Sequence, residues 1–331
     1  IFAGLPEIFE SEGYDRTSMK LPKCQDRLIE EVLKVQPNVV VVLHNGSPVE
    51  LPWADRVSAI LEMYLGGQGV GEACDRLLFG EANPSGRLAE TFPYRLEDNP
   101  SFLHFPGNGK RVLYGEDIFV GYRYYDTKKV PVRYAFGHGL SYTEFTYGDL
   151  TLSSAQMTDE DILTVSLKVK NSGKTEGKEV VQLYVADLCG ISERPVKELK
   201  GFAKVHLLPG EEKTVSMEIS ARNLSYYEER LGDWYAPSGT YRILIGHASD
   251  DVRLHADIIF ETQKELPLCV DFTTTFGELL DHTKTAPVIT ELLAPLAAAA
   301  ASAEGMSDEY KKLGEQVIRE MPLKSLLGQM P

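Results

Sequence analysis

The sequence predicts an α/β part followed by an all-β part and a helical tail. Between residues 21 and 92, helical periodicity alternates with short runs of β-branched residues. Between residues 145 and 260, apolar side chains recur at every second position, as in strands with one buried face. Helical spacing returns beyond residue 266. We expect four segments: a partial α/β sandwich with a parallel sheet at 1–93, an aromatic-rich connector at 94–144, a β-sandwich at 145–262 and a helical tail at 263–331.

The first helix and strand of the α/β part have a clear pattern. Apolar residues at helical spacing predict a helix over residues 23–35, which ends before Pro37. The β-branched run Val39–Leu43 predicts a buried parallel strand. The turn after it, residues 44–48, should face the ligand crevice of such a sheet. The further elements expected here are a short helix at 53–57, a strand at 58–64, a glycine-rich turn at 66–69 and a helix at 71–79.

The predicted sheet is too small to stand alone. Residues 1–9 contain Gly4 and Pro6 and are expected to form a loop, which leaves only two strands. A two-stranded parallel sheet is not stable by itself. We therefore expect further strands on polypeptide that precedes Ile1. The chain begins without Met, and we interpret it as a processed piece or a fragment of a longer protein.

The connector is rich in aromatic residues, whereas solvated linkers contain few. Its many Gly and Pro residues predict an irregular backbone. We expect it to pack against the flanking domains or against a domain outside this sequence. The aromatic residues are Tyr94, Phe102, Phe105, Tyr114, Phe119, Tyr122, Tyr124, Tyr125, Tyr134 and Phe136.

The all-β part has several runs of alternating apolar residues, separated by turn sequences such as residues 171–173 and 209–211. About seven short strands in about 115 residues are typical of a β-sandwich of the immunoglobulin or fibronectin type. The alternating residues are Val165, Leu167, Val169, Val181, Leu183, Val185, Val215, Met217, Ile219, Tyr241, Ile243 and Ile245.

The tail is predicted to be helical. Phe276, Leu279 and Leu280 share one helical face, and the alanine run 297–301 favours helix strongly. A second amphipathic helix is expected over residues 307–320. Because the tail is too small to form a domain alone, we expect it to dock on another surface.

The overall composition disfavours two classes of partner. The net charge is −15, the pI is about 5.0, and no basic patch could follow a phosphate backbone. Nucleic acid and anionic membrane surfaces are therefore poor partners. The longest apolar runs are far shorter than the roughly 20 residues of a membrane-spanning helix. A neutral ligand such as a sugar is compatible with this charge.

The cysteines and other polar residues give no sign of a metal or cofactor site. The spacing of Cys24, Cys74, Cys189 and Cys269 fits neither a zinc site nor a compact disulfide framework. We expect mostly buried free thiols, which favours a reducing compartment and a cytoplasmic location over a periplasmic or secreted one. The glycine-rich turn lacks the G-x-G-x-x-G spacing of dinucleotide-binding loops. We therefore expect no cofactor and no metal.

The acidic loop, residues 10–16 with sequence ESEGYDR, concentrates the side chains suited to catalysis. Glu10 and Glu12 lie two residues apart, and like charges at close range raise one another's pKa. A carboxyl group that keeps its proton near neutral pH can serve as a general acid. The alternative is that both are ordinary solvated acids, which is the usual state of Glu in a loop.

Six stretches, in order across residues 1–260, together resemble glycoside hydrolase family 3 enzymes, the β-glucosidases in particular. They are SEGYDR at 11–16, HNGSPVELPW at 44–53, GGQGVGEACDRLLFGEANPSGRLAETFP at 66–93, RVLYGEDIFVGYRYYD at 111–126, YAFGHGLSYTEF at 134–145 and ELKGFAKVHLLPGE at 198–211. The resemblance implies three parts: a TIM-type barrel with an Asp nucleophile, an α/β sandwich with an acid/base Glu, and a fibronectin type III-like domain. This sequence has most of the second part and all of the third, and we find no barrel in it.

The resemblance also assigns roles. It implies that Glu12 is the acid/base residue of a retaining mechanism, with Glu10 as the competing candidate. The nucleophile would lie on another chain or on a removed segment, so the isolated chain is expected to be inactive. The substrate would be a β-linked oligosaccharide or glucoside that loses glucose from its non-reducing end. From the residues themselves, we expect Tyr14, Asp15 and Arg16 to support the loop. Asp15 and Arg16 should pair with each other or with neighbours, and Tyr14 could pack beneath the loop or line the sugar site.

Three aspects stay open at this point. Phe102, His104 and Phe105 could stack against sugar in an outer subsite, or could pack in the core. The connector and the tail could contact a second copy in a homodimer, or the barrel. The function could be another family 3 specificity (β-xylosidase, arabinofuranosidase or N-acetylglucosaminidase), or the chain could be a non-enzymatic carbohydrate-binding module.

Overall fold

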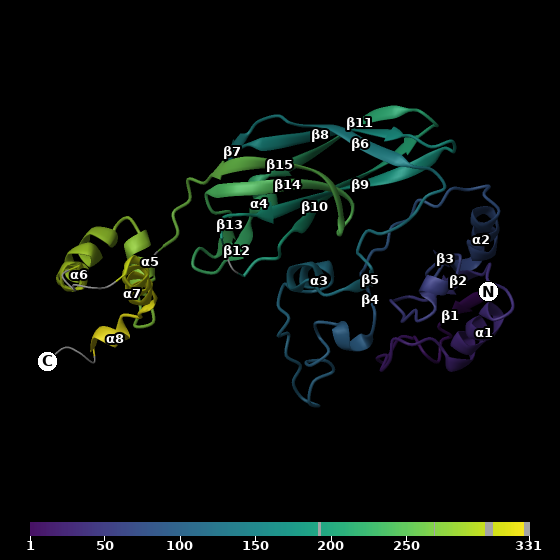
Figure 1. Cartoon of the computed structure of the whole chain (residues 1–331), viewed down its shortest axis with the longest axis horizontal. Coiled ribbons are helices and arrows are strands. Elements are labelled where there is room, and N and C mark those ends of the chain that lie inside the picture. The colour runs from purple at the N-terminus through teal and green to yellow at the C-terminus, as the bar shows by residue number, and fades with distance from the viewer. Residues whose placement is uncertain (191–192, 268, 302–306, 328–331) are drawn as a thin grey trace. The chain divides into compact units, whose positions relative to one another are not determined.

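The computed structural model describes the whole chain except residues 191–192, 268, 302–306 and 328–331. The chain divides into two compact units. One consists of Ile1–Tyr226 and Ala236–Gln263, and the other of Tyr227–Tyr235 and Lys264–Pro331. The first unit contains the α/β part, the connector and the β-sandwich, and the second contains the helical tail (Figure 1).

Three parallel strands in the order β1-β2-β3 form the sheet of the α/β part (Figure 1). The predicted order of helices and strands between residues 23 and 79 is confirmed, although the short helix expected at 53–57 is a single 3₁₀ turn. The buried core of this part includes Ile29, Val41, Leu43 and Trp53. Its elements are β1 (Phe2–Gly4), α1 (Lys23–Leu33), β2 (Val40–His44), η1 (Ala54–Arg56), β3 (Ala59–Glu62), η2 (Gly67–Gly69) and α2 (Val70–Leu78).

The prediction that residues 1–9 form a loop is wrong at its start, because β1 is a strand. Phe2 pairs with Val42, and Gly4 pairs with His44, in parallel register. A Cβ atom at position 4 would lie 2.0 Å from the His44 carbonyl oxygen. Gly4 is therefore the residue that permits this close pairing, and Pro6 lies beyond the end of the strand.

The connector is more regular than predicted. It contributes η3 (Leu96–Asp98), α3 (Tyr122–Lys128) and β5 (Val132–Tyr134), and β5 pairs with β4 (Phe92–Pro93). The Tyr122 ring stacks on Phe136 with a centroid distance of 4.8 Å and meets Tyr184 of the β-sandwich edge-on. The Tyr122 hydroxyl also accepts a hydrogen bond of 2.7 Å from the backbone N–H of Leu199. The expected packing of connector aromatics against a flanking domain is thus confirmed at Tyr122.

The β-sandwich is confirmed, with eight described strands in two sheets where about seven were expected. One sheet has the order β10-β9-β14-β15-β7, and the other has the order β11-β8-β6 (Figure 1). The alternating apolar residues predicted for the core are buried there. The strands are β6 (Phe145–Leu152), β7 (Gln156–Thr158), β8 (Ile162–Asn171), β9 (Gly177–Asp187), β10 (Glu198–Leu207), β11 (Glu212–Ser220), β14 (Gly239–Ala248) and β15 (Asp251–Glu261), and a short helix α4 (Ala221–Leu224) follows β11.

The tail is helical, as predicted. Phe276, Leu279 and Ile289 form the small buried core of the second unit. None of the helices that the structure describes is long and apolar enough to cross a membrane. The elements of this unit are the paired strands β12 (Tyr226–Glu228), whose first residue belongs to the first unit, and β13 (Asp233–Tyr235), followed by α5 (Phe276–Asp281), α6 (Ala286–Ala301), α7 (Asp308–Glu320) and α8 (Lys324–Leu327).

All four cysteines are free thiols, but the prediction that most are buried is wrong. Cys74 is buried, Cys189 is half-buried, and Cys24 and Cys269 are exposed. Within the described residues, no three His, Cys, Asp or Glu side chains gather in a way that could hold a metal ion.

Candidate active site

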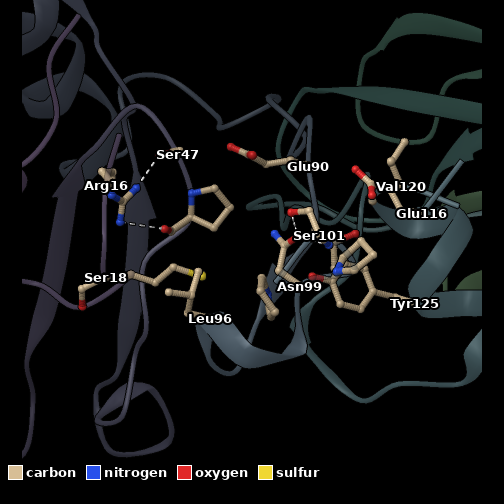
Figure 2. A pocket seen from close by; sticks show the side chains of 16 residues that line it. Arg16, Ser18, Ser47, Glu90, Leu96, Asn99, Ser101, Glu116, Val120 and Tyr125 are labelled. Atoms are coloured by element: carbon tan, nitrogen blue, oxygen red, sulfur yellow. Dashed lines mark hydrogen bonds between the residues drawn. The ribbon is translucent and has the colours of Figure 1, made fainter. Parts of the chain in front are cut away.

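The acidic loop folds back on the turn that follows β2. The Glu10 carboxylate accepts hydrogen bonds from the Gly46 backbone N–H at 2.6 Å and from Ser47 Oγ at 2.5 Å. Arg16 Nη1 lies 3.4 Å from the same carboxylate and also donates to Ser47 Oγ. Arg16 Nη2 donates to the Pro48 carbonyl oxygen at 3.2 Å (Figure 2). Both ends of the loop are therefore attached to one turn.

Glu12 lies at the centre of the acidic loop and is exposed. Its carboxylate has no hydrogen bond or ion pair with any residue that the structure describes. Asp15 is also exposed and has no side-chain partner among those residues, whereas the Tyr14 hydroxyl donates to the Glu7 carbonyl oxygen. The carboxylate of Glu12 is therefore available to a molecule that approaches the loop from outside.

A buried amide holds the turn from the side of the sheet. Asn45 is fully buried, and its Nδ2 donates to the Ser47 carbonyl oxygen at 3.0 Å and to Glu62 Oε2 at 3.1 Å. Burial raises the pKa of Glu62 to about 7, and the charge of nearby Glu90 acts in the same direction. Burial likewise raises the pKa of Glu90. Two carboxyl groups that resist ionisation thus lie close to the acidic loop.

An open cavity of about 470 Å³ adjoins the acidic loop (Figure 2). Its volume lies in the range of small-molecule sites. Thr91 Oγ1 and Glu116 Oε2 are buried in this region and have no hydrogen-bond partner among the described residues. The polar residues that line the cavity include Arg16, Ser47, Glu90, Asn99, Glu116 and Tyr125.

The three connector residues considered as a possible sugar subsite do not line this cavity. Phe102, His104 and Phe105 are not among the described residues that line it, although their neighbour Ser101 is. Phe102 is 42% exposed and Phe105 is 49% exposed, so neither packs in the core. The His104 ring rests against Gly115, where a Cβ atom would lie 2.7 Å from His104 Nε2.

Asn45 and Ser47 lie in the turn at residues 44–48 that was expected to face the ligand crevice, whereas Glu62 and Glu90 were not predicted as site residues. Asn45 and Ser47 follow the end of β2, and Glu62 is the last residue of β3. Because the carboxyl ends of parallel strands meet at one edge of a sheet, their positions were a usable signal. Glu90 does not follow a predicted strand, so no pattern in the sequence indicated that it would lie at the cavity. Only tertiary packing brings it there.

Two family models match this chain. Residues 1–142 match the glycosyl hydrolase family 3 C-terminal domain, and residues 179–249 match a fibronectin type III-like domain. A thermostable beta-glucosidase B from Acetivibrio thermocellus is 48% identical over 328 residues, which cover 99% of this chain and 43% of that protein. A beta-glucosidase from Kluyveromyces marxianus is 45% identical over 268 residues, which cover 80% of this chain and 31% of that protein.

Solved structures agree with these matches. The K. marxianus beta-glucosidase in complex with glucose superposes with a TM-score of 0.74 at 43% identity, over 78% of this chain and 31% of that one. A GH3 beta-glucosidase from Bifidobacterium adolescentis gives a TM-score of 0.80 at 39% identity, over 87% of this chain and 42% of that one. This chain spans less than half the length of each of these relatives, and its described residues contain no barrel. The chain therefore contains a glycosyl hydrolase family 3 C-terminal domain and a fibronectin type III-like domain.

Proposed function

We propose that this chain forms the acid/base half of a retaining β-glucosidase. The observation that supports the proposal is the position of Glu12. Its exposed carboxylate has no partner among the described residues and lies in a loop whose two ends are attached to the turn after β2. The relatives named above are beta-glucosidases, and the K. marxianus structure is a complex with glucose.

The proposed reaction uses two carboxyl groups. Glu12 donates its proton to the glycosidic oxygen while an Asp carboxylate attacks the anomeric carbon, so that the C–O bond breaks and a glycosyl–enzyme ester forms. The Glu12 carboxylate then takes a proton from water, whose oxygen attacks the anomeric carbon and releases glucose with retained configuration. The two carboxyl groups need to lie about 5–5.5 Å apart. The Asp belongs to a barrel segment outside this sequence, and the chain alone is inactive.

A complementation assay tests whether this chain supplies the acid/base residue and a separate barrel segment supplies the nucleophile. The N-terminal part of the A. thermocellus enzyme, which lies outside its match to this chain, is co-expressed with residues 1–331. Hydrolysis of an aryl β-glucoside should require both pieces. Activity of residues 1–331 alone would contradict the proposal.

The variant Glu12→Gln tests the role of the acid. For phenyl β-glucoside, whose leaving group needs protonation, kcat/KM should fall by about 10²–10⁴-fold. For 2,4-dinitrophenyl β-glucoside, whose leaving group needs no proton, kcat/KM should change little, and added azide should raise kcat and yield glucosyl azide. Glu7→Gln, an exposed acid nearby in the sequence, is the matched control. Native kcat/KM on the phenyl glucoside would remove Glu12 from this role.

The names of the relatives favour glucosides over the other family 3 substrates. A panel of aryl glycosides with glucose, xylose, arabinofuranose and N-acetylglucosamine would distinguish these specificities on the reconstituted enzyme. Sugar binding by residues 1–331 in calorimetry, without hydrolysis in the complemented enzyme, would instead favour a carbohydrate-binding module.

A further inference from the structure

We infer that Glu10 and Arg16 are positioning residues that clamp the two ends of the acidic loop and so fix the place of the Glu12 carboxylate. The inference deepens the proposed function and depends on it. It differs from the role of Glu10 as a competing general acid, which the sequence alone left open.

The clamp joins both ends of the loop to one turn, residues 46–48. Glu10 accepts hydrogen bonds from Gly46 and Ser47, and Arg16 donates to Ser47 and to the Pro48 carbonyl oxygen. The two side chains also pair with each other at 3.4 Å. Their side chains are only 20% and 17% exposed, respectively, so water screens this pair less than a surface ion pair.

The middle of the loop has almost no attachment of its own. The side chains of Ser11, Glu12 and Asp15 have no partner among the described residues, and no atom lies within 4 Å of a Cβ built at Gly13. The Tyr14 hydroxyl makes the one side-chain hydrogen bond recorded there, to a neighbouring loop carbonyl. The place of the Glu12 carboxylate therefore depends on where the two ends are held.

The turn that receives the clamp is itself fixed to the sheet. Asn45 connects the Ser47 carbonyl oxygen to Glu62 at the end of β3, with hydrogen bonds of 3.0 and 3.1 Å. Gly46 leaves room for the Glu10 carboxylate. A Cβ atom at position 46 would lie 3.1–3.3 Å from the carbon and the two oxygens of that carboxylate. Through these hydrogen bonds, the positions of the ends of two parallel strands fix the position of the acidic loop.

The same contacts argue against Glu10 as the proton donor to substrate. Both of its carboxylate oxygens already accept hydrogen bonds from the chain, and the donors lie on the side of the sheet. A general acid needs a geometry in which it reaches the leaving oxygen. Glu12, two residues further along, has that freedom.

The test compares Glu10→Gln and Arg16→Lys in the reconstituted enzyme. Because a displacement of about 1 Å can cost about 10²-fold in rate, we expect kcat/KM for phenyl β-glucoside to fall about 10–100-fold. For 2,4-dinitrophenyl β-glucoside, which needs no proton, we expect a loss below about 3-fold. The double variant should lose no more than the worse single variant, because both substitutions release the same loop.

Glu7→Gln and Arg27→Lys are the matched controls, since both side chains are exposed and neither has a partner among the described residues. Both should keep native rates. A purely structural role would instead lower kcat/KM equally for both substrates and lower the melting temperature, and that result would overturn the clamp. The Glu12→Gln variant separates the two proposals. If its kcat/KM does not fall more for the phenyl glucoside than for the 2,4-dinitrophenyl glucoside, the proposed function fails. If that difference is absent only in the clamp variants, the clamp alone fails.

Discussion

Glu62 shows how its surroundings set the charge of a single side chain beside the acidic loop. Burial is the main cause that raises its pKa to about 7, and the charges of Glu90 and Glu10 add to it. Hydrogen bonds from the Tyr64 N–H and the Asn45 amide oppose this shift. The carboxyl group of Glu62 therefore changes its charge near neutral pH, where an ordinary Glu is fully ionised.

This shift makes stability depend on pH. The pKa of Glu62 rises from 4.5 to about 7 on folding, so the folded state binds its proton more tightly. The resulting stabilisation is complete below pH 4.5 and is lost as the pH rises through about 7. Glu62→Gln, which stays neutral, should reduce the fall in unfolding free energy between pH 5 and pH 8 by up to about 3 kcal/mol. Urea denaturation of the native chain and the variant at pH 5 and pH 8 measures these unfolding free energies.

The control for this prediction is Glu72→Gln, an exposed acid on α2 with no partner among the described residues. It should leave the pH dependence of the unfolding free energy unchanged. If Glu62→Gln also leaves it unchanged, the Glu62 carboxyl is ionised across this range and its burial has no effect on stability.

At the residue scale, the sequence could suggest Glu12 because a short local motif surrounds it. It could not suggest the proton affinity of Glu62, because that depends on burial beneath residues far away in the chain. Arg16 was expected to support the loop, but its partners Ser47 and Pro48 lie 31 and 32 residues away. Local spacing carries no information about such pairs.

At the scale of elements, strand β1 was missed because Gly and Pro are local signals for a loop. Pairing with β2, about 40 residues away, outweighs that preference. The glycine that suggested a loop is in fact the residue that allows the strand to approach. Helix α3 was missed for a related reason, since aromatic residues between Gly and Pro show no helical periodicity, and Tyr125 is buried only by tertiary contacts.

The variant Gly4→Ala tests this account of β1. Its added Cβ would lie 2.0 Å from the His44 carbonyl oxygen, so β1 and β2 must move apart. We expect a loss of about 1–3 kcal/mol in unfolding free energy, which is typical of overpacking. Gly71→Ala on α2 is the control. Apart from its chain neighbours and its own helix backbone, no atom of the described residues lies within 4 Å of a Cβ there, and alanine favours helix. An equal effect of both substitutions would show that β1 is not closely paired.

At the scale of the whole molecule, the fold class and the order of most elements could be predicted, because amphipathic periods of two and 3.6 residues are visible in the sequence. The acid/base candidate could also be found. The clamp and the cavity could not, because they bring together the segments around residues 10, 47, 90 and 120, which only tertiary structure places side by side.

Glu179 in β9 is the buried carboxylate that links the β-sandwich to the preceding segments. Its Oε1 lies 3.0 Å from Arg87 Nη2 and 3.1 Å from His247 Nδ1, and His247 Nε2 lies 2.8 Å from the Gly139 carbonyl oxygen. Burial alone would raise the pKa of Glu179, but the hydrogen bond from His247 and the charge of Arg87 outweigh it, and the pKa lies below 4.5. The carboxylate form is therefore the one that stabilises the fold.

Glu179→Gln keeps the volume of the side chain but leaves the Arg87 guanidinium, 6% exposed, without its counter-charge. We expect a loss of about 3–5 kcal/mol in unfolding free energy at pH 7, as for other broken buried ion pairs. Because the pKa of Glu179 is lowered in the folded state, this stabilisation is present above pH 4.5 and is lost as the pH falls through the folded-state pKa. The difference in unfolding free energy between the variant and the native chain should therefore shrink in acid. Glu218→Gln, exposed on β11, is the control in urea denaturation. A native-like stability of Glu179→Gln would mean that the ion pair with Arg87 contributes little to holding these segments together.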